Sequence, residues 1–197
     1  MRGRIWLNSF INTLKEKEKT DYPENPKSDP EWTKFMKKVM EGVAEKMDCY
    51  VAQSFQEKGK ESCEYLNIDA IFIDNAEYDI MREDNGQYDP FVLPRAVVEL
   101  ENKYNIEKIS YCLWKILCVR APIRVLICYQ NGKEKVKSLR EHLENVIWQG
   151  SLMKGSDGDL LVVIGDDSAR EEASWEDYFT VFEWRSDRLE KIEGLKW

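Results

Sequence analysis

Three acidic residues on two apolar segments have the types and spacing needed to hold a divalent cation. Asp69 lies within the segment NIDAIFI, and Glu99 and Glu101 lie within AVVELEN. Strand side chains alternate between faces, so Glu99 and Glu101 share one face, with Cβ atoms about 7 Å apart. Antiparallel pairing of the two segments would place Asp69 beside them. Such carboxylates suit Mg²⁺ or Mn²⁺, which take oxygen ligands and complete their coordination with water and phosphate.

Two lysines follow these acids along the chain. Lys103 comes two residues after Glu101 on the same strand face, and Lys115 lies in the next segment of helical pattern. Either ammonium could neutralise a pentavalent phosphate or orient an attacking water, whose pKa a bound metal lowers. The set predicts metal-dependent hydrolysis of a phosphodiester. The alternative is a solvated sheet face with cross-strand lysine pairs. A glycosidase is disfavoured, because two acids side by side on one strand cannot readily flank a sugar.

The order of the helices and strands expected to position these residues predicts an α/β domain, with a mixed sheet flanked by helices. Apolar residues at helical spacing predict helices over 5–19, over 28 to about 50, over 106–118 and within 131–150. Runs of β-branched and aromatic residues predict one or two strands over 63–74 and further strands near 96–102, 121–129, 160–165 and 178–184.

The same pass along the chain predicts its organisation. Residues 1–27 are expected to be an appended arm or packing helix, because three prolines interrupt the segment 20–30 that follows the first helix. Residues 28–197 are expected to form a single domain. The long polar segment 75–90 is interpreted as a solvated loop, with a lid over the site as the alternative.

Together these segments resemble the PD-(D/E)XK nuclease superfamily. That family has a common αβββαβ core, with metal-binding acids on the second and third core strands. The likeness covers about residues 28–129, or 28–165 at its widest. By the resemblance Asp69 matches the first acid of the family, although Ile68 stands where the family has proline. The resemblance implies a restriction-endonuclease-like core and Mg²⁺- or Mn²⁺-dependent cleavage of DNA or RNA.

Two alignments of the second family motif compete. In the first, Glu101-Asn102-Lys103 is the E-x-K of the family, and Glu99 is an extra acid. In the second, Glu99-Leu100-Glu101 supplies the acids, and the lysine has migrated to the next helix as Lys115, as it does in some family members. We favour the second, in which Asp69, Glu99 and Glu101 bind the metal and Lys115 contacts the phosphate.

Many members carry an acid on the first helix, and Glu41 and Glu45 are both candidates here. A nuclease-like fold does not guarantee activity. The alternative function is therefore a catalytically inactive module that binds a protein or a nucleic acid, or regulates a partner.

The charge distribution gives opposing indications about nucleic acid as a partner. The net charge of −8 argues against nucleic acid, because phosphate binding draws on Lys and Arg, and it favours the inactive-module alternative. Residues 103–140, however, contain nine Lys and Arg against two acids. This basic block predicts a contact with nucleic acid. An uneven surface without consequence is the other interpretation.

Apolar runs, cysteines, the histidine and the tryptophans indicate the expected location of the protein and the residues not expected to take part in a site. No apolar run approaches the roughly 20 residues that span a bilayer, and the N-terminus is too charged for a signal peptide, so we expect a cytoplasmic location. The five cysteines lack metal-site spacing and mostly lie among apolar residues, so they are expected to be buried free thiols. His142, the only histidine, is interpreted as an ordinary surface or boundary residue. Most tryptophans are expected in the core, with base stacking as the alternative for Trp114.

Overall fold

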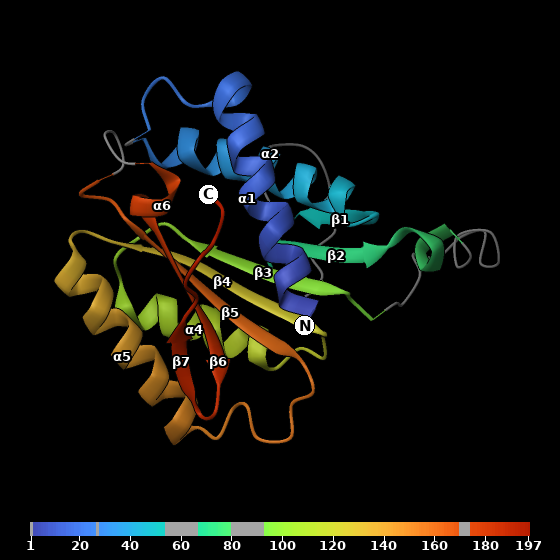
Figure 1. Cartoon of the computed structure of the whole chain (residues 1–197). Helices are drawn as coiled ribbons and strands as arrows, with labels where there is room; N and C mark the ends of the chain where they lie inside the picture. The colour runs from blue at the N-terminus through green and yellow to red at the C-terminus, as the bar shows by residue number, and fades with distance from the viewer. Residues whose placement is uncertain (1, 27, 54–66, 80–92, 170–173) are drawn as a thin grey trace.

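The protein forms a seven-stranded mixed sheet covered by helices on both faces (Figure 1). The computed structural model describes residues 2–26, 28–53, 67–79, 93–169 and 174–197. The strands lie in the sheet in the order of the chain: β1 (Cys49–Gln53), β2 (Ala70–Asp74), β3 (Ala96–Glu101), β4 (Ile123–Gln130), β5 (Asp159–Asp166), β6 (Phe179–Arg185) and β7 (Arg188–Lys191). This architecture confirms the predicted α/β class with a mixed sheet.

The direction of the strands divides the sheet into three parts. The first three strands form an antiparallel meander, β3 to β5 are parallel, and β5 to β7 are again antiparallel. The parallel connections run through α4 (Ile106–Leu117) and α5 (Lys133–Gln149). Every residue of β4 is buried, as expected of a central parallel strand covered on both faces.

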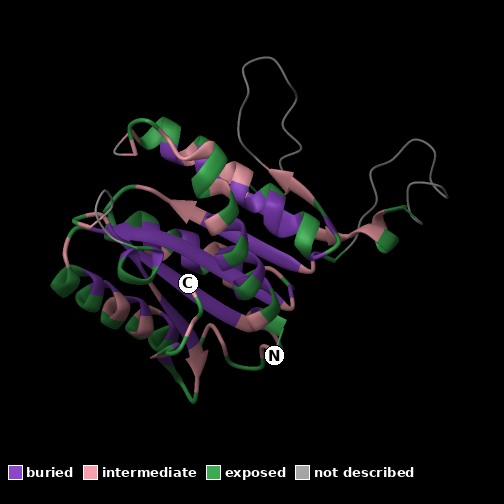
Figure 2. Cartoon of the chain, turned by 45° about the horizontal axis from the view of Figure 1, so that its top comes forward, coloured by how far each residue is buried: buried purple, intermediate pink, exposed green. Residues whose placement is uncertain are grey.

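Two hydrophobic clusters lie on opposite faces of the sheet because alternate strand residues point to opposite sides. On β3, Val98 belongs to the cluster under α1 (Arg2–Asp21) and α2 (Asp29–Lys46), whereas Val97 belongs to the cluster under α4 and α5. Figure 2 shows buried residues through the central strands and exposed residues on the outer sides of the helices.

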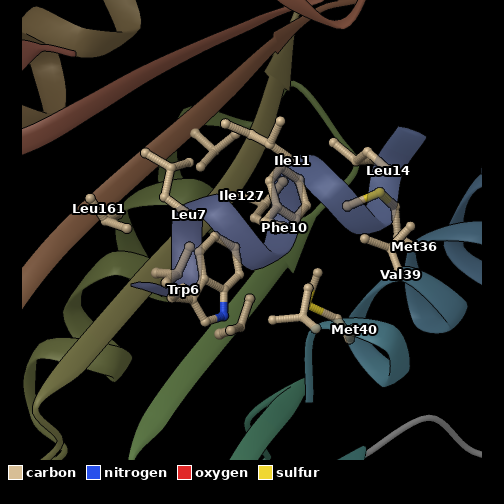
Figure 3. Packing of buried hydrophobic residues seen from close by; sticks show 14 of the residues in the cluster. Trp6, Leu7, Phe10, Ile11, Leu14, Met36, Val39, Met40, Ile127 and Leu161 are labelled. Carbon is tan, nitrogen blue, oxygen red and sulfur yellow. The ribbon is translucent and has the colours of Figure 1, made fainter. Parts of the chain in front are cut away.

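The N-terminal helix is part of the first cluster. Trp6, Leu7, Phe10 and Leu14 of α1 are fully buried. Figure 3 shows these side chains lying between the sheet, represented by Ile127 and Leu161, and the apolar residues of α2. Residues 2–21 therefore form a helix that packs directly against the central sheet.

The helices predicted over 5–19, 106–118 and 131–150 are confirmed, but the end of the second helix was predicted wrongly. This helix ends at Lys46 instead of continuing to about residue 50, and Cys49–Gln53 forms strand β1. Asp48 takes the left-handed conformation, with φ 53°, and reverses the chain. The strand is stabilised by pairing with β2, a long-range contact that a local pattern cannot reveal.

Some of the predicted segments lie partly or wholly outside the described residues. Residues 75–79 are helical, and the rest of the predicted loop or lid, from residue 80, lies outside the described residues. The same holds for residues 63–66 of the predicted strand region and for Cys63. The four cysteines of the described ranges are free thiols, and Cys49, Cys112 and Cys128 are buried as predicted, whereas Cys118 is exposed at the end of α4. Within those ranges no helix combines the length and the apolar character needed to cross a bilayer.

Candidate functional site

Asp69 and Glu99 lie side by side where β2 begins and β3 nears its end. The register pairs Ala70 with Val98, so the preceding residue, Asp69, falls opposite Glu99. The backbone N–H of Asp69 donates to Glu99 Oε1 at 3.3 Å, and the N–H of Leu100 donates to Asp69 Oδ2 at 2.8 Å. The antiparallel pairing predicted from the sequence therefore brings these two acids together.

Lys115 completes the cluster from the adjacent helix. Its Nζ lies 2.7 Å from Glu99 Oε1 and also donates to the carbonyl oxygen of Asn67. Helix α4 presents this lysine to the acids because Ile109, Leu113 and Ile116 bury its apolar side against the sheet. The side chain of Lys115 is 16% exposed and that of Glu99 is 2% exposed, so the ion pair is largely removed from solvent.

The electrostatics of the cluster show an excess of negative charge. Burial, followed by repulsion from Asp69, raises the pKa of Glu99 to about 7, although Lys115 opposes the change. Burial also raises the pKa of Asp69, against the hydrogen bond from Leu100 and the charge of Lys115. One ammonium does not compensate the buried carboxylate of Glu99 together with the half-buried carboxylate of Asp69. A further positive charge in this place would stabilise the ionised form of both acids.

Glu101 and Lys103 lie at the edge of this cluster. Glu101 is half-buried and its charge contributes to the raised pKa of Asp69, but its Oε1 accepts a hydrogen bond from the backbone N–H of Lys103 at 2.9 Å. The side chain of Lys103 is exposed. Of the two candidate lysines, the structure places the ammonium of Lys115 against the acids, while the contact of Lys103 is made by its backbone.

The carboxylates of the cluster can be compared with the ligands that a divalent cation takes from a protein. Within the described residues, no three His, Cys, Asp or Glu side chains are grouped so as to hold a metal ion. Asp69 and Glu99 nevertheless supply the one or two carboxylates that Mg²⁺ usually takes from a protein. The two candidate acids of the first helix, Glu41 and Glu45, are exposed on α2, which covers the opposite face of the sheet from α4.

Two side chains beside the cluster, Cys112 and Tyr111, have contacts that were not predicted from the sequence. The thiol of Cys112 hydrogen bonds to Glu99, and burial together with the charge of Glu99 raises the pKa of this cysteine. Tyr111 is 59% exposed and stacks on Trp114, with ring centroids 5.7 Å apart, and Lys115 Nζ lies 6.0 Å from the centre of the Tyr111 ring. The helical spacing that places Tyr111 and Trp114 on the side of α4 opposite Leu113 was the sequence signal that could have predicted this exposed aromatic pair.

The basic block 103–140 is divided among several elements. Lys115 belongs to the acidic cluster, Arg124 is buried on β4, and three lysines lie on α5. The histidine predicted to be ordinary, His142, has its Nε2 2.9 Å from Ser110 Oγ, between α5 and α4.

Two comparisons with known proteins complete these observations. No protein-family model matches the chain, and no curated protein matches it.

Proposed function

We propose that this protein is a Mg²⁺- or Mn²⁺-dependent nuclease of the PD-(D/E)XK type. The order of elements from α2 to β4 supports the proposal: a helix, three antiparallel strands, a helix and a strand parallel to the third. This is the αβββαβ order of the restriction-endonuclease-like core. The acids stand at the second and third of these strands, as the resemblance implies.

The observation that carries the proposal is the convergence of Asp69, Glu99 and Lys115. These residues come from three elements and are brought together in a largely buried place, at a cost shown by the raised pKa values of both acids. Placing two carboxylates against each other with one lysine costs folding free energy, which favours a functional reason for the arrangement. Strongly perturbed carboxyl groups of this kind are typical of functional sites.

Each residue then has a role in phosphodiester hydrolysis. Asp69 and Glu99 would hold the ion, which when bound polarises the phosphoryl group and lowers the pKa of a water molecule. Glu101 would help to hold the ion or orient the water from the edge of the cluster. Lys115 would turn part of its hydrogen-bonding capacity to a phosphate oxygen, stabilising the charge that develops there.

The surface beside the cluster supports nucleic acid as the substrate. The exposed rings of Tyr111 and Trp114 lie next to Lys115, and the exposed Lys108 is on the same helix. Aromatic rings flanked by cations suit unstacked bases and the adjoining phosphates. Trp114 is 47% exposed and is therefore not a core residue, which leaves its ring available for the proposed base stacking.

A nuclease assay tests the proposal. Single- and double-stranded DNA and RNA are incubated with wild type, Asp69→Asn, Glu99→Gln and Lys115→Met in Mg²⁺, in Mn²⁺ and in EDTA. We expect cleavage by wild type in a divalent cation only, and a loss of about 100-fold or more in each variant. Lys19→Met is the matched control, because it removes an exposed lysine of α1, which covers the opposite face of the sheet from α4. Equal cleavage by Lys115→Met and Lys19→Met would contradict the assignment of Lys115.

A second candidate function keeps the fold without the chemistry. It is favoured by the oxygen atoms of the acids, which already have protein partners: Asp69 Oδ2 accepts from Leu100, Glu99 Oε1 contacts Lys115, and Glu101 Oε1 accepts from Lys103. A module of this kind would bind nucleic acid or a protein without cleaving it. Retention of an oligonucleotide by wild type, with no cleavage in either cation, would support this candidate and refute the first.

A further inference from the structure

A second concave site lies at the end of the parallel strands away from the acidic cluster. Its cavity of about 780 Å³ is formed at the N-terminal ends of β3, β4 and β5 by residues 93–95, 117–122 and 152–158, with Arg2 of α1 beside them. Glu99 and Glu101 lie toward the C-terminal end of β3. The cavity is within the size range of pockets that bind small ligands.

Arg124 in the wall of this cavity is a buried cation that no acid of the described residues pairs with. It is 6% exposed, and its guanidinium donates from Nε to the carbonyl oxygen of Val119 and from Nη1 to Ser156 Oγ, both at 3.0 Å. Both acceptors are neutral, and within the described ranges Arg124 forms no ion pair. Burial lowers the pKa of this arginine, with no carboxylate opposing the effect. Buried charges in proteins are usually paired, whereas the described partners of Arg124 are neutral.

Other cations face the same cavity. Arg2, Arg120 and Lys154 are exposed and line it, and they too form no ion pair with any described residue. The fifth cation, Arg95, is 3.2 Å from Asp74 and is therefore compensated. Two further acids, Glu77 and Asp157, line the cavity, so among the described lining residues the uncompensated charge is positive.

The loop after α5 fixes the arginine in place. A Cβ atom at Gly158 would lie 2.3 Å from Arg124 Nη1 and 2.5 Å from the carbonyl oxygen of Ala121, so a residue larger than glycine would displace one of them. The guanidinium is thus held by close packing and by two hydrogen bonds before any ligand arrives. A preorganised donor of this kind loses little entropy on binding.

We propose that this cavity binds the phosphate group of a small phosphorylated ligand, with Arg124 as the central contact and Arg120 and Lys154 at the rim. A guanidinium has five N–H donors in a planar fork that matches two phosphate oxygens, and Arg124 uses two of its nitrogens on neutral acceptors. The bound phosphate supplies the negative charge that the wall lacks. This site is separate from the nuclease proposal and does not depend on it.

The test measures binding of inorganic pyrophosphate in EDTA, by thermal unfolding and by isothermal titration, against KCl at the same ionic strength. The absence of divalent cations keeps the acidic cluster out of the result. We expect the melting temperature of wild type to rise by about 5 °C or more at a pyrophosphate concentration near 100 times the dissociation constant. Arg124→Gln should abolish binding.

A second variant protects the test from a folding defect, because Arg124 also holds Val119 and Ser156. The double variant Arg120→Gln/Lys154→Gln changes exposed side chains and should weaken pyrophosphate binding about tenfold or more. Lys135→Gln is the matched control, since this lysine is exposed on α5 away from the cavity, and should bind as wild type does. No binding to wild type, or equal affinity in the double variant and the control, would overturn the proposal.

Discussion

Replacing Glu99 by glutamine is expected to make the protein more stable above neutral pH. The side chain of Glu99 ionises near 4.5 in an unfolded chain, whereas burial and Asp69 raise its pKa to about 7 in the folded protein. Because the folded state holds this proton more tightly, the contribution of Glu99 to stability is greatest below about pH 4.5, falls as the pH rises to about 7, and is then level. At about 1.4 kcal/mol per pH unit, the ionised carboxylate costs about 3 kcal/mol.

Glutamine keeps the shape of the protonated acid and cannot ionise. The variant should therefore match wild type near pH 4 and exceed its free energy of unfolding by up to about 3 kcal/mol near pH 8, which corresponds to about 6–12 °C in melting temperature. The ion pair with Lys115 is already included in this value, because it acts on the pKa of Glu99.

Urea denaturation at a series of pH values measures this difference in the absence of divalent cations. Glu141→Gln serves as the control, since this acid is exposed on α5 and its removal should leave the pH profile unchanged. A Glu99→Gln variant whose stability follows wild type at all pH values would refute the electrostatic description of the cluster. So would a variant that is less stable near pH 8.

Two further predictions concern the partners of this cluster and the N-terminal helix. Lys115→Met leaves the buried Glu99 without its ammonium and should cost about 3 kcal/mol near pH 8 but less near pH 5, where Glu99 is protonated; denaturation of this variant beside Lys108→Met checks the difference. Trp6→Ala should cost about 3–5 kcal/mol in urea denaturation, because Trp6 is fully buried, whereas Ile5→Ala, at a residue 51% exposed, should cost below about 1 kcal/mol; equal losses would contradict the packing of α1.

The pairing of the two acids was within reach of the sequence, because strand alternation fixes which side chains share a face. Glu99 and Asp69 were expected on adjacent strands, and the register places them opposite each other. The choice between Lys103 and Lys115 was harder. It depends on the rotation of α4 against the sheet, which is set by the packing of residues such as Leu113 and not by the local pattern alone.

Other features depend on contacts distant in sequence. Strand β1 follows the second helix with no turn signal except Asp48, and its pairing with β2 decides its conformation. Arg124 lies in an apolar strand and could have been a surface residue at the strand end. Its burial follows from the close approach of Gly158, a residue 34 positions further along the chain. Such contacts are tertiary, and neither periodicity nor composition encodes them.

The most direct test of the central claim is Mn²⁺ binding to wild type and Asp69→Asn by isothermal titration. Since the metal binds ionised carboxylates, the affinity of wild type should be full near pH 8 and fall about tenfold for each pH unit below about 7, the pKa of Glu99. Asp69→Asn should give no heat of Mn²⁺ binding near pH 8 or below pH 7. Equal heats of Mn²⁺ binding in wild type and Asp69→Asn would contradict the claim that these acids share a divalent cation.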